Sequence, residues 1–270
     1  MPVGNIPTDV DLETRPKLRK QERRKHILLE LRLRPHVRIS ELADHFRVSA
    51  ETVRRDIGKL SDDGLLDRAH GGASAIISGR YPSFNERATD RVNERERIGR
   101  LAANLVQPGE TLMVDSGATT LQLARFLAFD GTPCTVFTNS FPVAMALGQS
   151  DAANVVVCPG DYLSSESAVV GTDAVEFLQR HSVDRCLIGA SGLSEGGPSE
   201  TIRGFAAVKR TMLRQCRMSH LLIDGRKFGR EGLAQIGNLS DLTSVVSDQD
   251  PTAELAKSLR YSNVEVLVAR

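Results

Sequence analysis

The sequence predicts an α/β protein in which an N-terminal winged helix-turn-helix domain precedes a doubly wound domain with a mainly parallel sheet. Two observations predict this fold class. Residues 20–73 carry three short amphipathic helical patterns followed by a pair of short strands. Beyond residue 94, short β-rich apolar runs alternate with helical patterns, which is typical of a parallel sheet covered by helices. We therefore expect a winged-helix domain over 17–73 and an α/β domain over 94–270.

The first residues are predicted to be a disordered tail, over 1–16, because they carry three acids and no apolar stretch. They do not resemble a signal peptide. The longest run without charge, residues 131–150, is interrupted by two prolines and several polar residues, so we expect no membrane span. The four cysteines are widely separated, which favours reduced, buried thiols over a metal site. We expect a cytoplasmic protein without a metal or another cofactor.

Positive charge is concentrated in one part of a nearly neutral chain. The whole chain has 35 Lys and Arg against 34 Asp and Glu, whereas residues 15–72 have 15 against nine. Such a local excess is expected of a segment that approaches phosphates, although a solvated helix face gives the same count.

The first two helices are predicted from their apolar faces. Residues 20–33 place Ile27 and Leu31 on one side of a helix. Ser40 is a good residue to cap a short second helix over 41–46. These two helices would form the support of a helix-turn-helix.

The third helix is the expected recognition helix. Ser49 can cap it, and Val53, Ile57 and Leu60 recur at the spacing of one buried face. The opposite face is polar and basic, and residues 65–73 then read as a two-stranded wing. From this helix, its caps and the wing we expect DNA contacts by Ser40, Ser49, Thr52, Arg54, Arg55, Lys59, Arg68 and His70. The alternative for each residue is a solvated or capping role, and winged helices also bind proteins.

These segments resemble a known family. The runs Ile39-Ser-Glu-Leu-Ala43, Val48-Ser-Ala-Glu-Thr-Val-Arg-Arg-Asp-Ile57 and Gly64-Leu-Leu-Asp-Arg-Ala-His-Gly-Gly-Ala73 are similar to the N-terminal domain of DeoR-type bacterial transcription regulators. The resemblance implies that Thr52, Arg54 and Arg55 enter the major groove of operator DNA.

The α/β domain follows a polar connector, which we expect over residues 74–93. Strands are predicted at 111–114, 135–138, 155–158, 186–189, 221–224, 245–247 and 264–268. Helices are predicted between them at 95–105, 119–128, 142–147, 173–180 and 206–216.

Ligands of such sheets bind at the carboxyl ends of the strands. The first loop, residues 115–120, combines a glycine with hydroxyl side chains at a helix N-terminus, which suits a phosphate. Later strand ends add amides, hydroxyls and an ammonium group. We expect an anionic, hydroxyl-rich effector to contact Asp115, Ser116, Gly117, Ala118, Thr119, Thr120, Asn139, Ser140, Gly160, Asp184 and Lys227. Each loop taken alone is more often an ordinary capped turn.

The resemblance extends over nearly the whole chain, through residues 115–120, 138–140, 183–193, 207–213 and 227–229. It implies a sensor domain similar in fold to ribose-phosphate isomerases, with a phosphorylated sugar as effector. The sequence departs from the family pattern at Ala118, Pro159, Phe205 and Gly225-Arg226. Arg226 and Arg230 beside Lys227 suggest a more acidic ligand, or simply a solvated basic loop.

We therefore expect a homo-oligomeric repressor of carbohydrate or polyol catabolism genes, whose effector changes the spacing of paired winged helices. The sequence does not fix whether the effector relieves or promotes repression. The main alternative is a sugar-phosphate isomerase that carries a DNA-binding module. No paired carboxylates follow the Ser191-Gly192 turn, so we expect a regulator and not an enzyme. A winged helix that docks onto another protein is the third interpretation.

Overall fold

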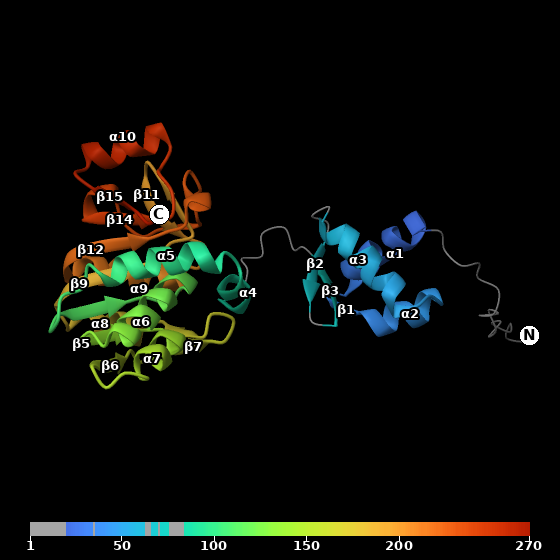
Figure 1. Ribbon diagram of the computed structural model, residues 1–270, viewed down its shortest axis with the longest axis horizontal. Helices are drawn as coiled ribbons and strands as arrows, with labels where there is room; N and C mark the ends of the chain where they lie inside the picture. The colour runs from blue at the N-terminus through green and yellow to red at the C-terminus, as the bar shows by residue number, and fades with distance from the viewer. Residues whose placement is uncertain (1–19, 35, 63–65, 70, 76–83) are drawn as a thin grey trace, which may run out of the picture. The chain divides into compact units, whose positions relative to one another are not determined.

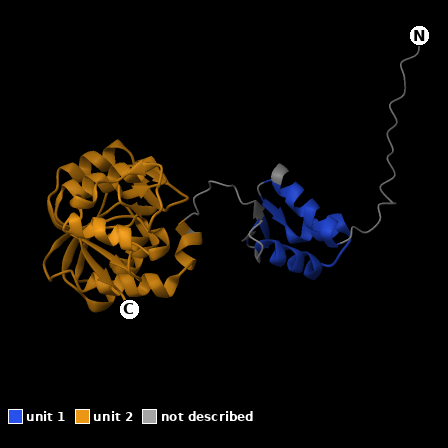
Figure 2. Ribbon diagram, turned by 90° about the horizontal axis from the view of Figure 1, so that it is seen from above, with its two compact units in different colours: residues 1–80 blue, residues 81–270 orange. Residues whose placement is uncertain are grey.

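The computed structural model describes residues 20–34, 36–62, 66–69, 71–75 and 84–270. The chain forms two compact units, which comprise residues 1–80 and 81–270 (Figure 2). Each unit has hydrophobic core residues of its own.

The first unit is a winged helix-turn-helix, as predicted (Figure 1). Its elements are α1 (Lys20–Leu33), β1 (His36–Arg38), α2 (Ile39–Phe46), α3 (Ala50–Asp62), β2 (Leu66–Ala69) and β3 (Gly72–Ala75). The strands form an antiparallel sheet in the order β1-β3-β2, in which Val37 is paired with Ala73. Ile27, Phe46 and Val53 belong to the core between the helices and the sheet. Strand β1 has three residues and was not predicted, because so short an element shows no alternation.

The predicted cap of the second helix is wrong, and that of the third is right. Helix α2 begins at Ile39 with Arg38 as its N-cap, so Ser40 lies exposed inside the first turn. In α3, Ser49 Oγ accepts a hydrogen bond from Thr52 N at 3.2 Å. His70 of the predicted wing contacts and most of residues 74–83 of the predicted connector lie outside the described residues.

The second unit is built on seven parallel strands, which confirms the predicted sheet. Their spatial order is β15-β14-β12-β9-β4-β5-β6. The strands are β4 (Thr111–Val114), β5 (Cys134–Thr138), β6 (Ala153–Val157), β9 (Val183–Ile188), β12 (Cys216–Leu222), β14 (Ser244–Ser247) and β15 (Glu265–Val268). Central strands are apolar on both faces because helices cover both.

Helices lie on both sides of the sheet (Figure 1). One side carries α5 (Val92–Ala103), α6 (Ala118–Asp130) and α7 (Phe141–Leu147), whose apolar residues share a core with Leu112 and Val136. The other side carries α8 (Thr172–Gln179), α9 (Arg203–Arg214) and α10 (Ala253–Tyr261), which pack around Met113 and Ile188. Alternate residues of β4 thus serve the two cores.

Smaller elements extend the α/β unit beyond the predicted ones. They are α4 (Phe84–Thr89), the hairpin β7 (Asp161–Leu163) and β8 (Ala168–Val170), the small sheet of β10 (Gly192–Ser194), β11 (Gly197–Glu200) and β13 (Ala234–Gln235), and the 3-10 turns η1 (Gly225–Lys227) and η2 (Leu239–Asp241). The connector was predicted to extend to residue 93, but the second compact unit already includes α4 and the start of α5.

Two further expectations concern membranes and cysteines. Among the described residues, no helix combines the length and the apolar character needed to cross a membrane. All four cysteines are free, and Cys134, Cys158 and Cys186 are buried while Cys216 is partly exposed.

Candidate functional site

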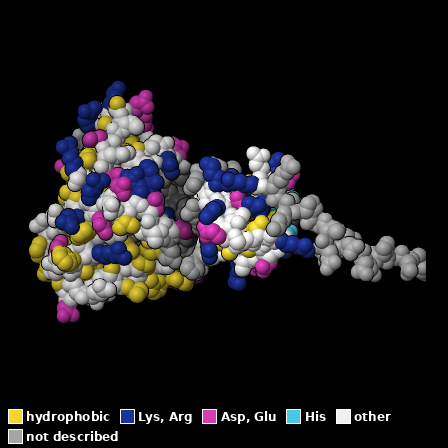
Figure 3. Space-filling view, turned by 45° about the vertical axis from the view of Figure 1, so that its right-hand side comes forward, with side chains coloured by type: hydrophobic (Ala, Val, Ile, Leu, Met, Phe, Trp, Pro, Cys, Tyr) yellow, Lys and Arg dark blue, Asp and Glu magenta, His cyan; other side chains and the backbone are white. Residues whose placement is uncertain are grey.

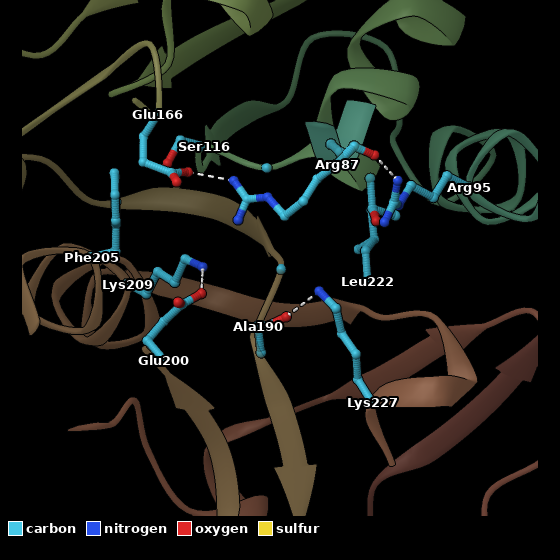
Figure 4. A pocket seen from close by; sticks show the side chains of 14 residues that line it. Arg87, Arg95, Ser116, Glu166, Ala190, Glu200, Phe205, Lys209, Leu222 and Lys227 are labelled. Atoms are coloured by element: carbon cyan, nitrogen blue, oxygen red, sulfur yellow. Dashed lines mark hydrogen bonds and ion pairs between the residues drawn. The ribbon is translucent and has the colours of Figure 1, made fainter. Parts of the chain in front are cut away.

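The candidate ligand pocket lies where the strand order reverses direction. From β4 the chain moves outward through β5 and β6, and later from β9 outward through β12, β14 and β15. Loops that leave neighbouring strands in opposite directions open a crevice at the carboxyl ends of β4 and β9. A pocket occupies this place (Figure 4), lined by Arg87, Arg95, Ser116, Gly117, Ala118, Thr119, Glu166, Gly189, Ala190, Glu200, Phe205, Lys209, Leu222 and Lys227.

One wall of the pocket is the N-terminus of α6. Gly117 is the N-cap, and no side chain caps this end of the helix. Ser116 is 7% exposed, and its Oγ has no hydrogen-bond partner among the described residues. Unsatisfied amides, the positive end of a helix dipole and a free hydroxyl together favour an anion. The predicted loop residues Ser116, Gly117, Ala118 and Thr119 therefore do lie in the pocket.

Behind this wall, Lys209 joins two buried carboxylates. Its Nζ lies 3.0 Å from Asp115 Oδ2 and also contacts Glu200 Oε1. Asp115 Oδ2 accepts a further bond from Gly189 N at 3.1 Å, and Glu200 Oε2 accepts one from Ser191 Oγ at 2.7 Å. Burial works to lower the pKa of Lys209, but the two carboxylates outweigh it and raise that pKa above its ordinary value. Lys209 is therefore a fixed positive charge.

Lys227 supplies a second ammonium group. Its Nζ donates to the carbonyl of Ala190 at 2.6 Å. Burial lowers the pKa of Lys227 to about 8, because the desolvation outweighs the attraction of Asp224 and Glu200. A bound anion would restore the charged form, since an opposite charge favours ionisation.

Two arginines complete the pocket, Arg87 and Arg95, and both lie near the start of the second unit. Arg87 of α4 pairs with Glu166, which lies in the turn between β7 and β8. Arg95 of α5 donates to the carbonyl oxygens of Arg87 and Asp90, and its Nη2 lies 3.9 Å from Asp224 Oδ2. The lining thus contains four cationic side chains and two carboxylates, which suits an anionic ligand that also carries hydroxyl groups.

Several predicted effector residues do not line this pocket. Asn139 Nδ2 donates to the carbonyl of Val169 at 2.9 Å, and Ser140 Oγ caps α7. Gly160 packs against the backbone of Val170, where a Cβ would lie 2.5 Å from its carbonyl oxygen. Asn139 Nδ2, Ser140 and Gly160 therefore hold the β7–β8 hairpin or α7 in place, while Asn139 Oδ1 is buried without a partner among the described residues.

Asp184, Thr120 and Asp115 also differ from the prediction. Asp184 lies at the opposite end of the sheet, because β9 begins at Val183, and it accepts hydrogen bonds from Thr111. Thr120 Oγ1 turns back to the carbonyl oxygens of Asp115 and Gly117, both at 3.1 Å. Asp115 does not line the pocket, but it contacts two residues that do, Lys209 and Gly189.

The prediction missed Arg87, Arg95, Glu166, Glu200 and Lys209. One signal was available: Lys209 shares a helical face with Phe205 and Met212, where a lysine is expected only if a carboxylate pairs with it. Arg226 was proposed to contact a more acidic ligand, but its Nη2 lies 2.5 Å from Asp90 Oδ2 and its Nε 3.5 Å from Asp224 Oδ1. These two carboxylates already neutralise it, and Arg230 does not line the pocket.

The predicted DNA-contacting face of α3 is exposed. Side chains of Arg54 and Arg55 are 61% and 79% exposed, and both lie within 3.5 Å of Glu51. Lys59 is also exposed, while Thr52 is half-buried beside Ser49. Lys and Arg side chains are spread over the visible face of the first unit (Figure 3). Arg68 belongs to β2, and its side chain is not among those described.

Helix α3 is fixed to α1 by a buried ion pair that the sequence did not reveal. Asp56 is 1% exposed, and its Oδ2 accepts from Arg23 Nε at 2.6 Å. Its Oδ1 accepts from Arg24 Nε at 2.9 Å. The carboxylate that follows Arg54 and Arg55 therefore orients α3, while the two arginines pair with Glu51 on the exposed face.

A winged helix with an exposed basic helix, followed by an α/β unit with a pocket lined by cationic side chains, defines a DNA-binding regulator with a sensor domain. Residues 23–78 match the model of the DeoR-like helix-turn-helix domain, and residues 90–249 match that of the DeoR C terminal sensor domain. The chain therefore belongs to the DeoR family of transcription regulators.

Relatives of similar length support this assignment. The glycerol-3-phosphate regulon repressor of Escherichia coli (strain K12) is 28% identical over 92% of this chain and 98% of its own. The transcriptional repressor CsqR of the same organism is 30% identical over 91% and 94%, and GlcR of Bacillus subtilis (strain 168) is 30% identical over 92% and 96%. These relatives are repressors, so the expectation of a regulator and not an enzyme is confirmed. Ribose 5-phosphate isomerase A of Methanocaldococcus jannaschii aligns with 52% of this chain and 55% of its own, at 15% identity and a TM-score of 0.39, a similarity too distant to bear on function.

Proposed function

We propose that this protein is a cytoplasmic, homo-oligomeric repressor of carbohydrate or polyol catabolism genes, controlled by a small phosphorylated sugar. The observation that supports the effector class most strongly is the pocket at the N-terminus of α6. The Ser116 hydroxyl, which has no partner among the described residues, and the uncapped end of α6 lie with Lys227 around one cavity, a set of donors that suits a phosphate. The carboxylate of Glu200 fits sugar hydroxyl groups. Relatives named for glycerol 3-phosphate regulation and repression support the same class.

DNA binding is proposed to rest on α3. Thr52, Arg54 and Arg55 would contact base edges, and Ser49 and Lys59 would contact phosphates. Paired copies would place two such helices on repeated half-sites, so we propose a dimer or a multiple of it. Effector binding changes operator affinity only if the effector binds one conformation better than the other.

The test is a titration of a duplex from the protein's own promoter region, in the presence of single sugar phosphates. Glycerol 3-phosphate, ribose 5-phosphate and glucose 6-phosphate are compared with the same compounds without phosphate. We expect at least one phosphorylated compound to change the operator affinity about tenfold or more, and its unphosphorylated form to have no effect. If no sugar phosphate changes the affinity, the proposed effector class is wrong. Absence of salt-dependent duplex binding would instead favour docking onto another protein.

A further inference from the structure

A carboxylate of the protein itself lies against one of the arginines of the pocket. Glu166 contacts Arg87 Nη2 across the cavity (Figure 4). Their side chains are only 5% and 13% exposed. Both residues line the pocket together with Ser116, whose hydroxyl lacks a partner among the described residues.

A second contact ties the same two segments together. Phe84 N, at the start of α4, donates to the carbonyl of Ser165 at 2.9 Å. Ser165 precedes Glu166 in the β7–β8 turn, so α4 holds this turn through a side chain and through the backbone. Arg95 in addition bonds the carbonyl of Arg87 and thereby keeps α4 in place on α5. The turn is thus attached to the first helix that follows residues 76–83.

The attachment is the kind that a stronger anion can replace. Burial raises the pKa of Glu166 above its ordinary value even though Arg87 opposes the shift, so this carboxylate is costly to keep ionised in the pocket. A phosphate monoester carries up to two negative charges and three acceptor oxygens, whereas a carboxylate carries one charge and two oxygens. Phosphate therefore pairs more strongly with a guanidinium than Glu166 does.

We infer that Glu166 is an internal competitor of the effector, whose anionic group takes the place of Glu166 on Arg87 and separates the β7–β8 turn from α4. The inference rests on the proposed function for the assignment of this pocket to an anionic effector. In this proposal Glu166 sets the affinity for the effector, and the contact between Glu166 and Arg87 is the one that changes when the effector binds.

The test measures binding of inorganic phosphate to the full chain by calorimetry. Glu166→Gln keeps the shape of the side chain but removes its charge, so we expect it to bind phosphate about tenfold more tightly than the wild type. Arg87→Ala should bind at least tenfold more weakly. Glu195→Gln is the matched control, because Glu195 is exposed in the turn between β10 and β11, away from the pocket. Its phosphate affinity should equal that of the wild type.

A second measurement follows the amide of Phe84 by hydrogen exchange. Saturating phosphate should increase the exchange rate of this amide at least fivefold in the wild type. In Arg87→Ala, phosphate should not change that rate. Glu166→Ala, which removes the carboxylate altogether, is measured as a second variant. The inference is overturned if neither Glu166→Gln nor Glu166→Ala binds phosphate more tightly than the wild type. It is also overturned if the wild type and both variants bind no phosphate. Unchanged exchange at Phe84 would overturn the separation of the turn from α4. The proposed function fails separately, if sugar phosphates leave operator affinity unchanged while these variants still differ in phosphate binding.

Discussion

Lys209 shows how a single buried residue can support a whole pocket. Its ammonium group neutralises Asp115 and Glu200, which are 0% and 5% exposed. Neither carboxylate could remain ionised at this depth without it, because an uncompensated buried charge is costly.

We therefore expect Lys209→Met to destabilise the second unit by about 3–5 kcal/mol, since it leaves two buried carboxylates without their cation. Urea unfolding followed by circular dichroism measures the effect. Lys257→Met is the control, because Lys257 is exposed on α10, away from its buried residues Leu255 and Leu259. A loss below about 1 kcal/mol for Lys209→Met would show that the carboxylates do not depend on it.

His220 should make stability depend on pH. Its Nε2 lies 3.1 Å from Arg185 Nη1 and its Nδ1 lies 2.8 Å from Ser244 Oγ. Burial, assisted by Arg185, lowers the pKa of His220 to about 4 from an ordinary value of 6.5. Between these two values the unfolded chain binds the extra proton and the folded chain does not, so stability falls as the pH is lowered through this range.

The stability contributed by neutral His220 is fully present above pH 6.5, and about 3 kcal/mol of it is lost as the pH falls to 4. We expect His220→Gln to reduce the slope of the unfolding free energy between pH 6.5 and 4 by about one proton. Urea titrations at several pH values measure this slope. An unchanged slope in His220→Gln would show that another group is responsible.

At the scale of elements, α3 combines a structural face with an exposed basic face, which is the face proposed to contact DNA. Asp56 faces α1, and the adjacent Arg54 and Arg55 face solvent. We expect Arg55→Ala to weaken operator binding by about 1–3 kcal/mol, because it removes a charged donor from the groove. Fluorescence anisotropy at fixed salt measures the affinity. Arg180→Ala serves as control, because Arg180 is exposed at the C-cap of α8 in the second unit. Equal affinities for Arg55→Ala and the wild type would argue against α3 as the recognition helix.

Asp56→Ala should act differently from Arg55→Ala. It deprives Arg23 and Arg24 of their shared carboxylate, so we expect it to destabilise the first unit by about 3 kcal/mol. Glu51→Ala, whose carboxylate is exposed, should cost less than about 1 kcal/mol. Thermal unfolding of the winged-helix unit distinguishes the two, and equal losses would mean that the buried pair does not hold α1 against α3.

The elements that the sequence predicted are those with long periodic patterns. All seven strands of the parallel sheet were expected, because each contains an apolar run; in the central strands this run reflects burial on both faces. Helix α10 was missed, although Thr252 caps it and Leu255 and Leu259 share its buried face. The strands β7, β10 and β11 have three or four residues, which is too few for alternation to be visible.

The pocket was predicted only where one local segment forms it. Ser116 and Gly117 lie between a strand and the start of a helix, and this local pattern is sufficient to predict an anion site. Arg87, Glu166 and Glu200 come from three other elements, and only the topology of the chain brings them together. Asp184 was misplaced because its position along β9 depends on where that strand begins.

At the scale of the whole molecule, each unit has a core of its own. The winged helix packs around Ile27 and Val53, and the α/β unit packs on both faces of its sheet. All residues that line the candidate pocket lie between Arg87 and Lys227 in the second unit. A unit with its own core and its complete site is expected to fold and to bind its ligand alone.

We therefore expect the fragment 81–270 to unfold in one cooperative transition, because its sheet and both helix layers are complete. It should bind inorganic phosphate with the affinity of the full chain to within about twofold, and it should show no salt-dependent binding of duplex DNA, since α3 is absent. Urea unfolding, calorimetry and anisotropy measure the three properties. A fragment that folds but binds phosphate much more weakly would show that residues before Tyr81 contribute to the site.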